Sequence, residues 1–153
     1  TQMRFLLLLI QLFSCPFAAL KPSLSSVHQK YKIRPFDPVT DQVALVDMCR
    51  HVYGGTDDLP RKALRYSKDP TCQFFTLVND HNIPTAVANL RYFDDYNNIR
   101  QWWLEGVRVS EEQRNQGLAF QLLSAMIDST TKPKEVLSCT IPSNYSMRRV
   151  FDR

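Results

Sequence analysis

Residues 107–119 read VRVSEEQRNQGLA and are the most informative segment of the sequence. Its first part alternates like a strand, and after Gly117 the apolar positions recur every four residues, which predicts an amphipathic helix. At such a turn, consecutive backbone N–H groups and the positive end of the helix dipole point the same way. Gly117 and Ala119 keep side chains out of the way there. Such a turn suits phosphate oxygens, but from spacing alone an ordinary strand-to-helix turn with a solvated Arg114 is the favoured interpretation.

The residues on either side predict a mixed sheet. Three β-rich runs, residues 73–78, 85–93 and 99–109, are joined by short turn-rich connectors and should form an antiparallel meander. The helix from residue 118 to about 130 then leads to an apolar run at 136–141. Because a crossover helix connects them, strand 136–141 should lie parallel to strand 99–109.

The remaining elements lie at the two ends of this sheet. A short strand is expected at 31–35, and a first helix at 40–52 with the Thr40 hydroxyl as its N-cap. The apolar stripe of this helix consists of Val43, Leu45, Val46, Cys49 and Val52. A glycine pair ends it, a second helix spans 60–67, and another helical segment starts at 143. Strands and helices in this order predict an α+β fold.

The pattern V-x-x-x-x-R-x-x-G-x-A, from Val109 to Ala119, resembles the acetyl-CoA motif of the GNAT N-acetyltransferase superfamily. The order of elements over residues 31–153 resembles that family too, and implies its mixed central sheet flanked by helices. In the family, the loop amides hold the pyrophosphate of acetyl-CoA and the preceding strand pairs with the pantetheine arm. The resemblance implies cofactor contacts at Val107, Val109, Arg114, Asn115, Gln116, Gly117, Leu118 and Ala119. Asn115 stands where many members have glycine.

A narrower resemblance rests on VYGGTDDLP at 52–60, KDP at 68–70 and LEGVRV at 104–109. These stretches resemble the vertebrate histidine N-acetyltransferase subfamily, which implies acetyl transfer to the α-amino group of histidine or a related amino acid. The first stretch also has a structural interpretation, as a glycine helix end followed by a proline-led helix start. Asp57 or Asp58 could attract an amine, but the structural interpretation is favoured for each carboxylate alone.

Glu105 is the predicted general base. It shares strand parity with Val107 and Val109, and family members often place a carboxylate on this strand. The alternative is that Glu105 pairs with Arg100 or Arg108.

The last helix departs from the family pattern. Many members carry a tyrosine there as general acid, seven residues after an asparagine, and counting from Asn144 gives Phe151. The family pattern would also continue past Arg153 into two further strands, so the domain is expected to be C-terminally incomplete. A CoA-binding or interaction module without catalysis is therefore the alternative function.

Composition excludes several other classes. The net charge is +4 without a basic tract, so no nucleic-acid partner is expected, and a small phosphorylated ligand fits this surplus better. The family resemblance implies a small-molecule amine or amino acid as the substrate partner. The four cysteines form no CxxC pair and the three histidines are scattered, so no metal site is expected. The sequence leaves the oligomeric state open.

The N-terminal segment is set apart from the domain. Residues 5–20, FLLLLIQLFSCPFAAL, are uncharged but shorter than the roughly 20 residues that span a bilayer. Residues 1–26 are interpreted as a signal-like or non-native hydrophobic segment, and residues 27–153 as the acetyltransferase domain. Use of acetyl-CoA implies the cytoplasm, while the segment leaves a secretory or membrane-attached location open.

Overall fold

A computed structural model describes residues 30–94, 97–129, 136–138 and 144–151. The strands are β1 (Tyr31–Pro35), β2 (Cys72–Asn79), β3 (Pro84–Asp94), β4 (Arg100–Val109) and β5 (Val136–Ser138). The helices are α1 (Gln42–Cys49), α2 (Leu59–Lys68), α3 (Leu118–Ser129) and α4 (Tyr145–Phe151), with short 3-10 turns η1 (Val52–Gly55) and η2 (Glu111–Gln113). The predicted segment 1–26 lies outside the described residues.

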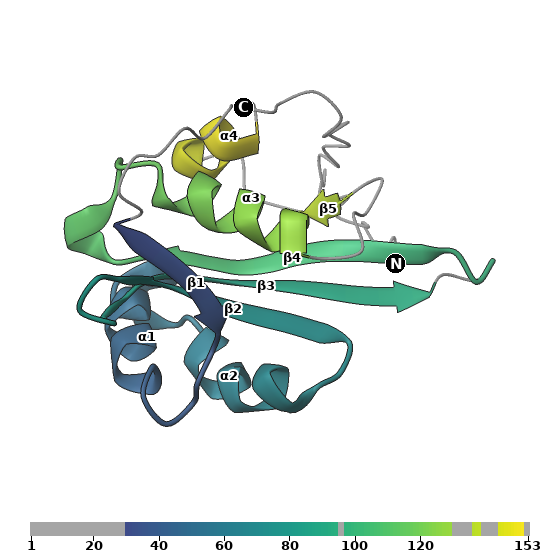
Figure 1. Cartoon of the computed structure of the whole chain (residues 1–153), viewed down its shortest axis with the longest axis horizontal. Helices are drawn as coiled ribbons and strands as arrows, with labels where there is room; N and C mark the ends of the chain where they lie inside the picture. The colour runs from purple at the N-terminus through teal and green to yellow at the C-terminus, as the bar shows by residue number, and fades with distance from the viewer. Residues whose placement is uncertain (1–29, 95–96, 130–135, 139–143, 152–153) are drawn as a thin grey trace, which may run out of the picture.

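The strands form one mixed sheet in the order β1-β2-β3-β4-β5. The first four pair antiparallel, and β5 runs parallel to β4 through Trp102 to Leu104. The Ser138 hydroxyl donates to the Leu104 carbonyl (3.0 Å) at this pair. Helices α1 and α2 cover one face of the sheet, and α3 and α4 the other (Figure 1). The predicted α+β architecture is confirmed.

Each face of the sheet has its own core. On the α3 face, Leu77, Leu90 and Leu104 pack against Leu122 and Met126 of the helix. On the opposite face the buried residues are Phe36, Leu45, Met48, Cys49, Leu59, Ala63, Tyr66, Phe74 and Val87. Burial on both faces explains the almost continuous apolar runs of β2 and β3.

The strands and the helix after Gly117 lie within two residues of their predicted bounds. Only residues 136–138 of the predicted strand 136–141 are described, and they pair parallel to β4 as expected. Helix α2 is two residues longer than predicted. In the described part of the chain, no helix is long and apolar enough to cross a membrane.

The prediction for the first helix was wrong in two respects. The Thr40 hydroxyl does not cap the helix but donates to Asp41 Oδ1 (3.1 Å). Val43 and Val46 are 80% and 49% exposed, whereas Leu45, Met48 and Cys49 are buried. The stripe was misassigned because nearly every residue of this short helix is apolar, so spacing alone does not select the buried side.

Asp41 joins β1 and β2 to the start of α1 through a buried network. Its carboxylate accepts two hydrogen bonds from the Arg34 guanidinium, both 2.7 Å long. It also accepts bonds from the Thr76 hydroxyl (3.0 Å) and from the backbone N–H of Asp37 (3.0 Å). A buried carboxylate with this many donors stays charged, so the network holds the helix against the sheet edge.

Candidate functional site

The turn between β4 and α3 is built from unusual backbone conformations. After η2, Arg114 is extended, and Asn115 and Gly117 have φ values of 63° and 77°. Asparagine tolerates the left-handed region better than most residues, so Asn115 suits a position where the predicted motif often has glycine. A Cβ built on Gly117 has no atom within 4 Å, which shows that the space beside this residue is open.

The turn leaves a run of backbone donors free. The amides of Gln113 and Arg114 bond to Ser110 and Glu111 within the turn. Among the described residues, no backbone or side-chain acceptor is found for the amides of residues 115–119, and the first bond into α3 is from Gln121 to the Gly117 carbonyl. These amides precede and open α3, where the helix dipole is positive, so the turn can bind an anion.

The predicted cofactor residues occupy this turn and the end of β4. Arg114, Asn115, Gln116 and Gly117 are exposed. Arg114 lies 4.0 Å from Glu111, a loose pair that leaves the guanidinium able to meet a ligand. Two of the other predicted residues, Leu118 and Ala119, start the helix, and the last two, Val107 and Val109, end the strand.

A β-bulge interrupts β4 just before these valines. Asn89 of β3 lies opposite Glu105 and Val87 lies opposite Arg108, so two residues of β4, Gly106 and Val107, face one residue of β3. Gly106 has a φ of 65°, and a Cβ on it would lie 2.9 Å from Leu59 Cδ1. The bulge therefore needs glycine for its backbone conformation and for the close approach of α2.

Gly106→Ala is expected to lower the free energy of unfolding by about 2 to 5 kcal/mol. About 1 to 2 kcal/mol comes from a side chain in the left-handed region, and overpacking against buried Leu59 adds about 1 to 3 kcal/mol. Gly54→Ala is the matched control, because Gly54 has a φ of 67° but open space around its Cβ position. Equal losses in urea unfolding of the two variants would contradict the steric part of this prediction.

The bulge also moves Glu105 to a different face from the one predicted. Val107 and Val109 pack against the core on the α3 side, whereas Glu105 lies beside Asn89 and Tyr66 on the α2 side. The prediction of shared strand parity with the valines was wrong because the extra residue at the bulge reverses the alternation. Glu105 is half-buried.

Neither arginine proposed as a partner pairs with Glu105. Arg100 lies near Asp94 (3.5 Å), and Arg108 donates to Asp57 (2.6 Å). The Arg108–Asp57 pair is largely buried, with side-chain exposures of 15% and 3%. The carboxylate of Glu105 instead accepts a hydrogen bond from the amide of Asn89 (3.0 Å). Within the part of the chain that the structure describes, Glu105 forms no ion pair with a cationic side chain.

The two carboxylates between α1 and α2 are both occupied. Asp57 pairs with Arg108, and Asp58 forms an ion pair with Lys62 (2.6 Å). Burial alone would raise the pKa of Asp57, but hydrogen bonds from Arg108, from the Leu59 N–H and from Cys49 together hold it below its ordinary value. These pairs agree with the structural interpretation of the segment. The Asp57–Arg108 pair connects the loop before α2 to the end of β4.

Cys49 lies next to this ion pair and is unsuited to nucleophilic chemistry. Burial, followed by the hydrogen bond and charge of Asp57, raises the pKa of its thiol to about 12. Burial also raises the pKa of Cys72. Both thiols stay protonated near neutral pH, as the predicted packing role of Cys49 requires. Within the described ranges, no group of three His, Cys, Asp or Glu side chains can hold a metal ion.

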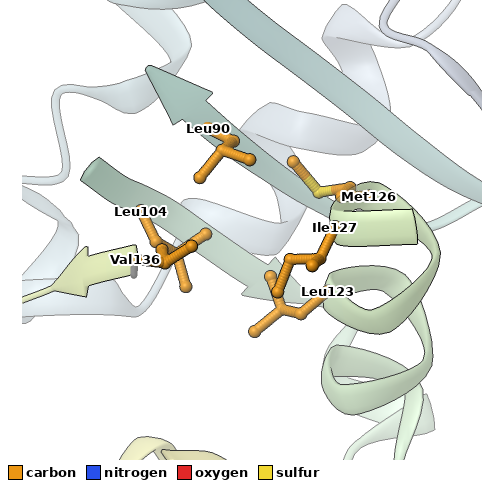
Figure 2. A pocket seen from close by; sticks show the side chains of 6 residues that line it. All are labelled: Leu90, Leu104, Leu123, Met126, Ile127 and Val136. Atoms are coloured by element: carbon orange, nitrogen blue, oxygen red, sulfur yellow. The ribbon is translucent and has the colours of Figure 1, made fainter. Parts of the chain in front are cut away.

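One small cavity lies under β5, on the α3 face of the sheet. Figure 2 shows its lining side chains converging from the strands and the helix: Leu90, Leu104, Leu123, Met126, Ile127 and Val136. The space is about 10 Å³ and its lining is apolar, so it suits neither a diphosphate nor an amine. It is a packing gap in the core rather than part of the anion site.

The family model that matches residues 42–153 is described as the acetyltransferase (GNAT) family. The chain belongs to this family. The match starts at α1 and includes the β4 bulge, the anion-binding turn and α4. Comparison with curated proteins gives no sequence match.

Solved structures share the fold. A transcriptional regulator from Bacillus halodurans C-125 has a TM-score of 0.65 at 17% identity, over 80% of this chain and 89% of that one. The aminoglycoside acetyltransferase AAC(6')-Iy, solved with a CoA-linked bisubstrate analogue, has a TM-score of 0.63 at 22% identity, over 80% and 87%. Glucosamine-6-phosphate N-acetyltransferase from Arabidopsis thaliana has a TM-score of 0.61 at 11% identity, over 80% and 90%.

Acetyl-CoA is the acetyl donor of the GNAT acetyltransferases, and the turn before α3 fits its diphosphate. The fit rests on the amides at 115–119, which meet no acceptor in the described ranges, and on the open space beside Gly117. A diphosphate would meet these donors and the helix dipole together.

Sequence reasoning missed one polar residue of this region, Asn89. It is fully buried in β3, where every neighbouring position is buried as well. An asparagine inside the apolar run TAVANLRYF was the available signal, because a buried amide needs a partner.

Proposed function

We propose that this protein is an acetyl-CoA-dependent N-acetyltransferase that acts on the amine of a small acceptor. The observation that carries the proposal is the run of amides at residues 115–119, at the start of α3, for which the described residues supply no acceptor. In this proposal, Arg114, Asn115, Gln116, Gly117, Leu118 and Ala119 hold the pyrophosphate. Val107 and Val109 present the strand edge to the pantetheine arm. Beyond Leu104, no described strand pairs with that edge of β4.

Bound acetyl-CoA supplies an activated thioester, and the chain supplies position and a base. Glu105 is half-buried and meets no cation directly, which suits it to accept a proton from the acceptor ammonium, directly or through water. Removal of that proton would give a neutral amine able to attack the thioester carbonyl. Formation of the amide N–C bond would break the acyl C–S bond and release CoA, whose thiolate takes up a proton. A fixed donor loop and a fixed base on one strand keep the reactants close and aligned.

The acceptor that the sequence supports best is histidine or a related amino acid. The support is the resemblance of VYGGTDDLP, KDP and LEGVRV to the histidine N-acetyltransferase subfamily. The occupied carboxylates Asp57 and Asp58 agree with an acceptor that carries few positive charges. The requirement for acetyl-CoA supports a location in the cytoplasm.

One observation favours a second candidate, a CoA-binding module without catalysis. Phe151, the last residue of α4, stands where many family members have the tyrosine that acts as general acid. In this case the protein binds CoA but transfers no acetyl group.

Two measurements on the full chain separate these functions. Calorimetry with CoA tests the anion-binding turn, and release of free CoA in the presence of histidine and a panel of small amines tests transfer. Binding with transfer supports the enzyme, whereas binding without transfer to any amine supports the module. Absence of CoA binding contradicts both.

Arg114→Ala is expected to weaken CoA binding about tenfold, or about 1.4 kcal/mol, because the exposed guanidinium loses a phosphate contact. The difference from the wild type should shrink at high salt, since exposed charges are screened. Arg50→Ala is the matched control, because Arg50 also forms an exposed i,i+3 pair, with Asp47 of α1, away from the turn. A similar loss of affinity in both variants would indicate a general charge effect instead of a contact at the turn.

A further inference from the structure

Glu105 is held by a residue from the neighbouring strand. Asn89 lies directly opposite it in the β3–β4 register, just before the bulge. The Asn89 Nδ2 group donates to Glu105 Oε1 at 3.0 Å. Because Asn89 is fully buried in the centre of the sheet, the donor has little freedom to move.

The orientation of the Asn89 amide is determined by its surroundings. Nδ2 also lies 3.6 Å from the Cys72 sulfur, a weak acceptor on β2. If the amide were reversed, Oδ1 would face the carboxylate and repel it. Oδ1 has no hydrogen-bond partner in the described part of the chain. The amide therefore directs its donor to Glu105 and leaves its acceptor unsatisfied.

Stability alone does not account for asparagine at this position. Burying an unsatisfied polar atom costs about 1 to 3 kcal/mol. The same face of β3 also carries the fully buried Val87, which packs in the core around α1 and α2. An aliphatic residue at position 89 would avoid the cost, so core packing does not explain the amide, whereas its hydrogen bond to Glu105 does.

The side chain of Tyr66 also interacts with the Glu105 carboxylate. Tyr66 is a buried residue of α2, and its pKa is raised first by burial and then by the negative charge of Glu105. The carboxylate thus accepts from the amide of Asn89 in the sheet and interacts with the phenol of Tyr66 and, through charge, with Lys62 on the helix. A carboxylate with one fixed donor and one neighbouring phenol has a restricted set of orientations.

We propose that Asn89 is a positioning residue that fixes the Glu105 carboxylate for proton removal from the acceptor amine. The inference rests on the proposed function, in which Glu105 is the base. Asn89 touches neither the donor nor the acceptor in this account, and acts only through the Nδ2–Oε1 hydrogen bond.

A double-mutant cycle in acetyl transfer tests the inference. Asn89→Ala is expected to lower kcat about tenfold or more, because a hydrogen bond to a charged group is lost, and to leave KM for acetyl-CoA within about twofold. In a plot of kcat against pH, the acidic limb of Asn89→Ala should lie at higher pH than that of the wild type, since the Glu105 carboxylate loses a donor that stabilises its charged form. In the Glu105→Gln background, Asn89→Ala should cause no further loss.

Thr85→Val is the matched control, because Thr85 is also fully buried in β3 and its hydroxyl donates to the Leu77 carbonyl (2.9 Å). It should reduce stability without moving the pH profile. Asn89→Asp is the second variant if the alanine variant does not fold. It places a carboxylate beside Glu105 and should move the acidic limb further, because two close carboxylates resist double ionisation.

The outcomes separate the inference from the proposed function. Multiplicative losses in the double variant, or an unmoved acidic limb in either Asn89 variant, would show that Asn89 is only structural and leave the enzyme assignment intact. Full activity of Glu105→Gln would remove the base and the inference with it. The ionisation of Tyr66 is a readout that does not depend on acetyl transfer, and comparison with Tyr66→Phe assigns its signal. In Glu105→Gln the pKa of Tyr66 should fall, because the negative charge that raises it is removed.

Discussion

Asp41→Ala is expected to lower the free energy of unfolding by about 3 kcal/mol, the lower end of the cost of breaking a buried ion pair. The carboxylate is fully buried, but the Arg34 side chain is 26% exposed and can regain some water. The variant also leaves the Thr76 hydroxyl and the Asp37 N–H without their acceptor. Urea unfolding followed by circular dichroism measures the loss.

Asp47→Ala is the control for this prediction, because its ion pair with Arg50 is exposed on both sides. An exposed pair contributes about 0 to 1 kcal/mol, so the control should lose little stability. A loss below about 1 kcal/mol in Asp41→Ala would mean that the network adds no more than a surface pair and does not hold α1 to the sheet.

The same network predicts the acid sensitivity of the fold. Burial alone would raise the pKa of Asp41, but hydrogen bonds from Arg34, Asp37 and Thr76 together lower it from 3.8. A carboxyl whose pKa is lower in the folded state stabilises the fold fully above its unfolded pKa. That stabilisation is lost as the pH falls through the folded pKa. Asp41→Ala should therefore flatten the decrease of stability below about pH 4.

The parts of the fold that sequence patterns predicted share a strong local signal. Strands β2, β3 and β4 are long apolar runs separated by turn residues, and α3 has a clean four-residue repeat after Gly117. The backbone of the turn before α3 was also predictable, because the tolerance of glycine and asparagine for positive φ is a local property of the chain.

The parts that were missed depend on contacts between distant residues. Thr40 had the right residue type for a cap, but the carboxylate of Asp41 attracts its hydroxyl. The β4 bulge was not predicted, although Gly106 within a strand is a typical sign of one. Without the bulge, Glu105 was assigned to the wrong face. The role of Asn89 became visible only when the register placed it opposite Glu105.

Glu105→Gln is expected to lower kcat about 10²- to 10⁴-fold, the usual contribution of a positioned general base. Glutamine has nearly the same shape and keeps an oxygen acceptor for the Asn89 amide, so the local packing should be preserved. The affinity for CoA should change little, because the anion-binding turn lies beyond the bulge. The measurement is kcat for acetyl transfer with acetyl-CoA saturating.

Glu112→Gln is the control for the loss of one negative charge. Glu112 is exposed in η2, makes no ion pair within the described residues, and should keep kcat within about twofold. The pH profile gives the sharper distinction between roles of Glu105. A base gives an acidic limb that disappears in Glu105→Gln, whereas a purely structural carboxylate lowers activity by a similar factor at every pH. Because the bulge separates Glu105 from the donor-binding end of β4, a large loss of kcat with unchanged CoA affinity would assign proton transfer to this residue.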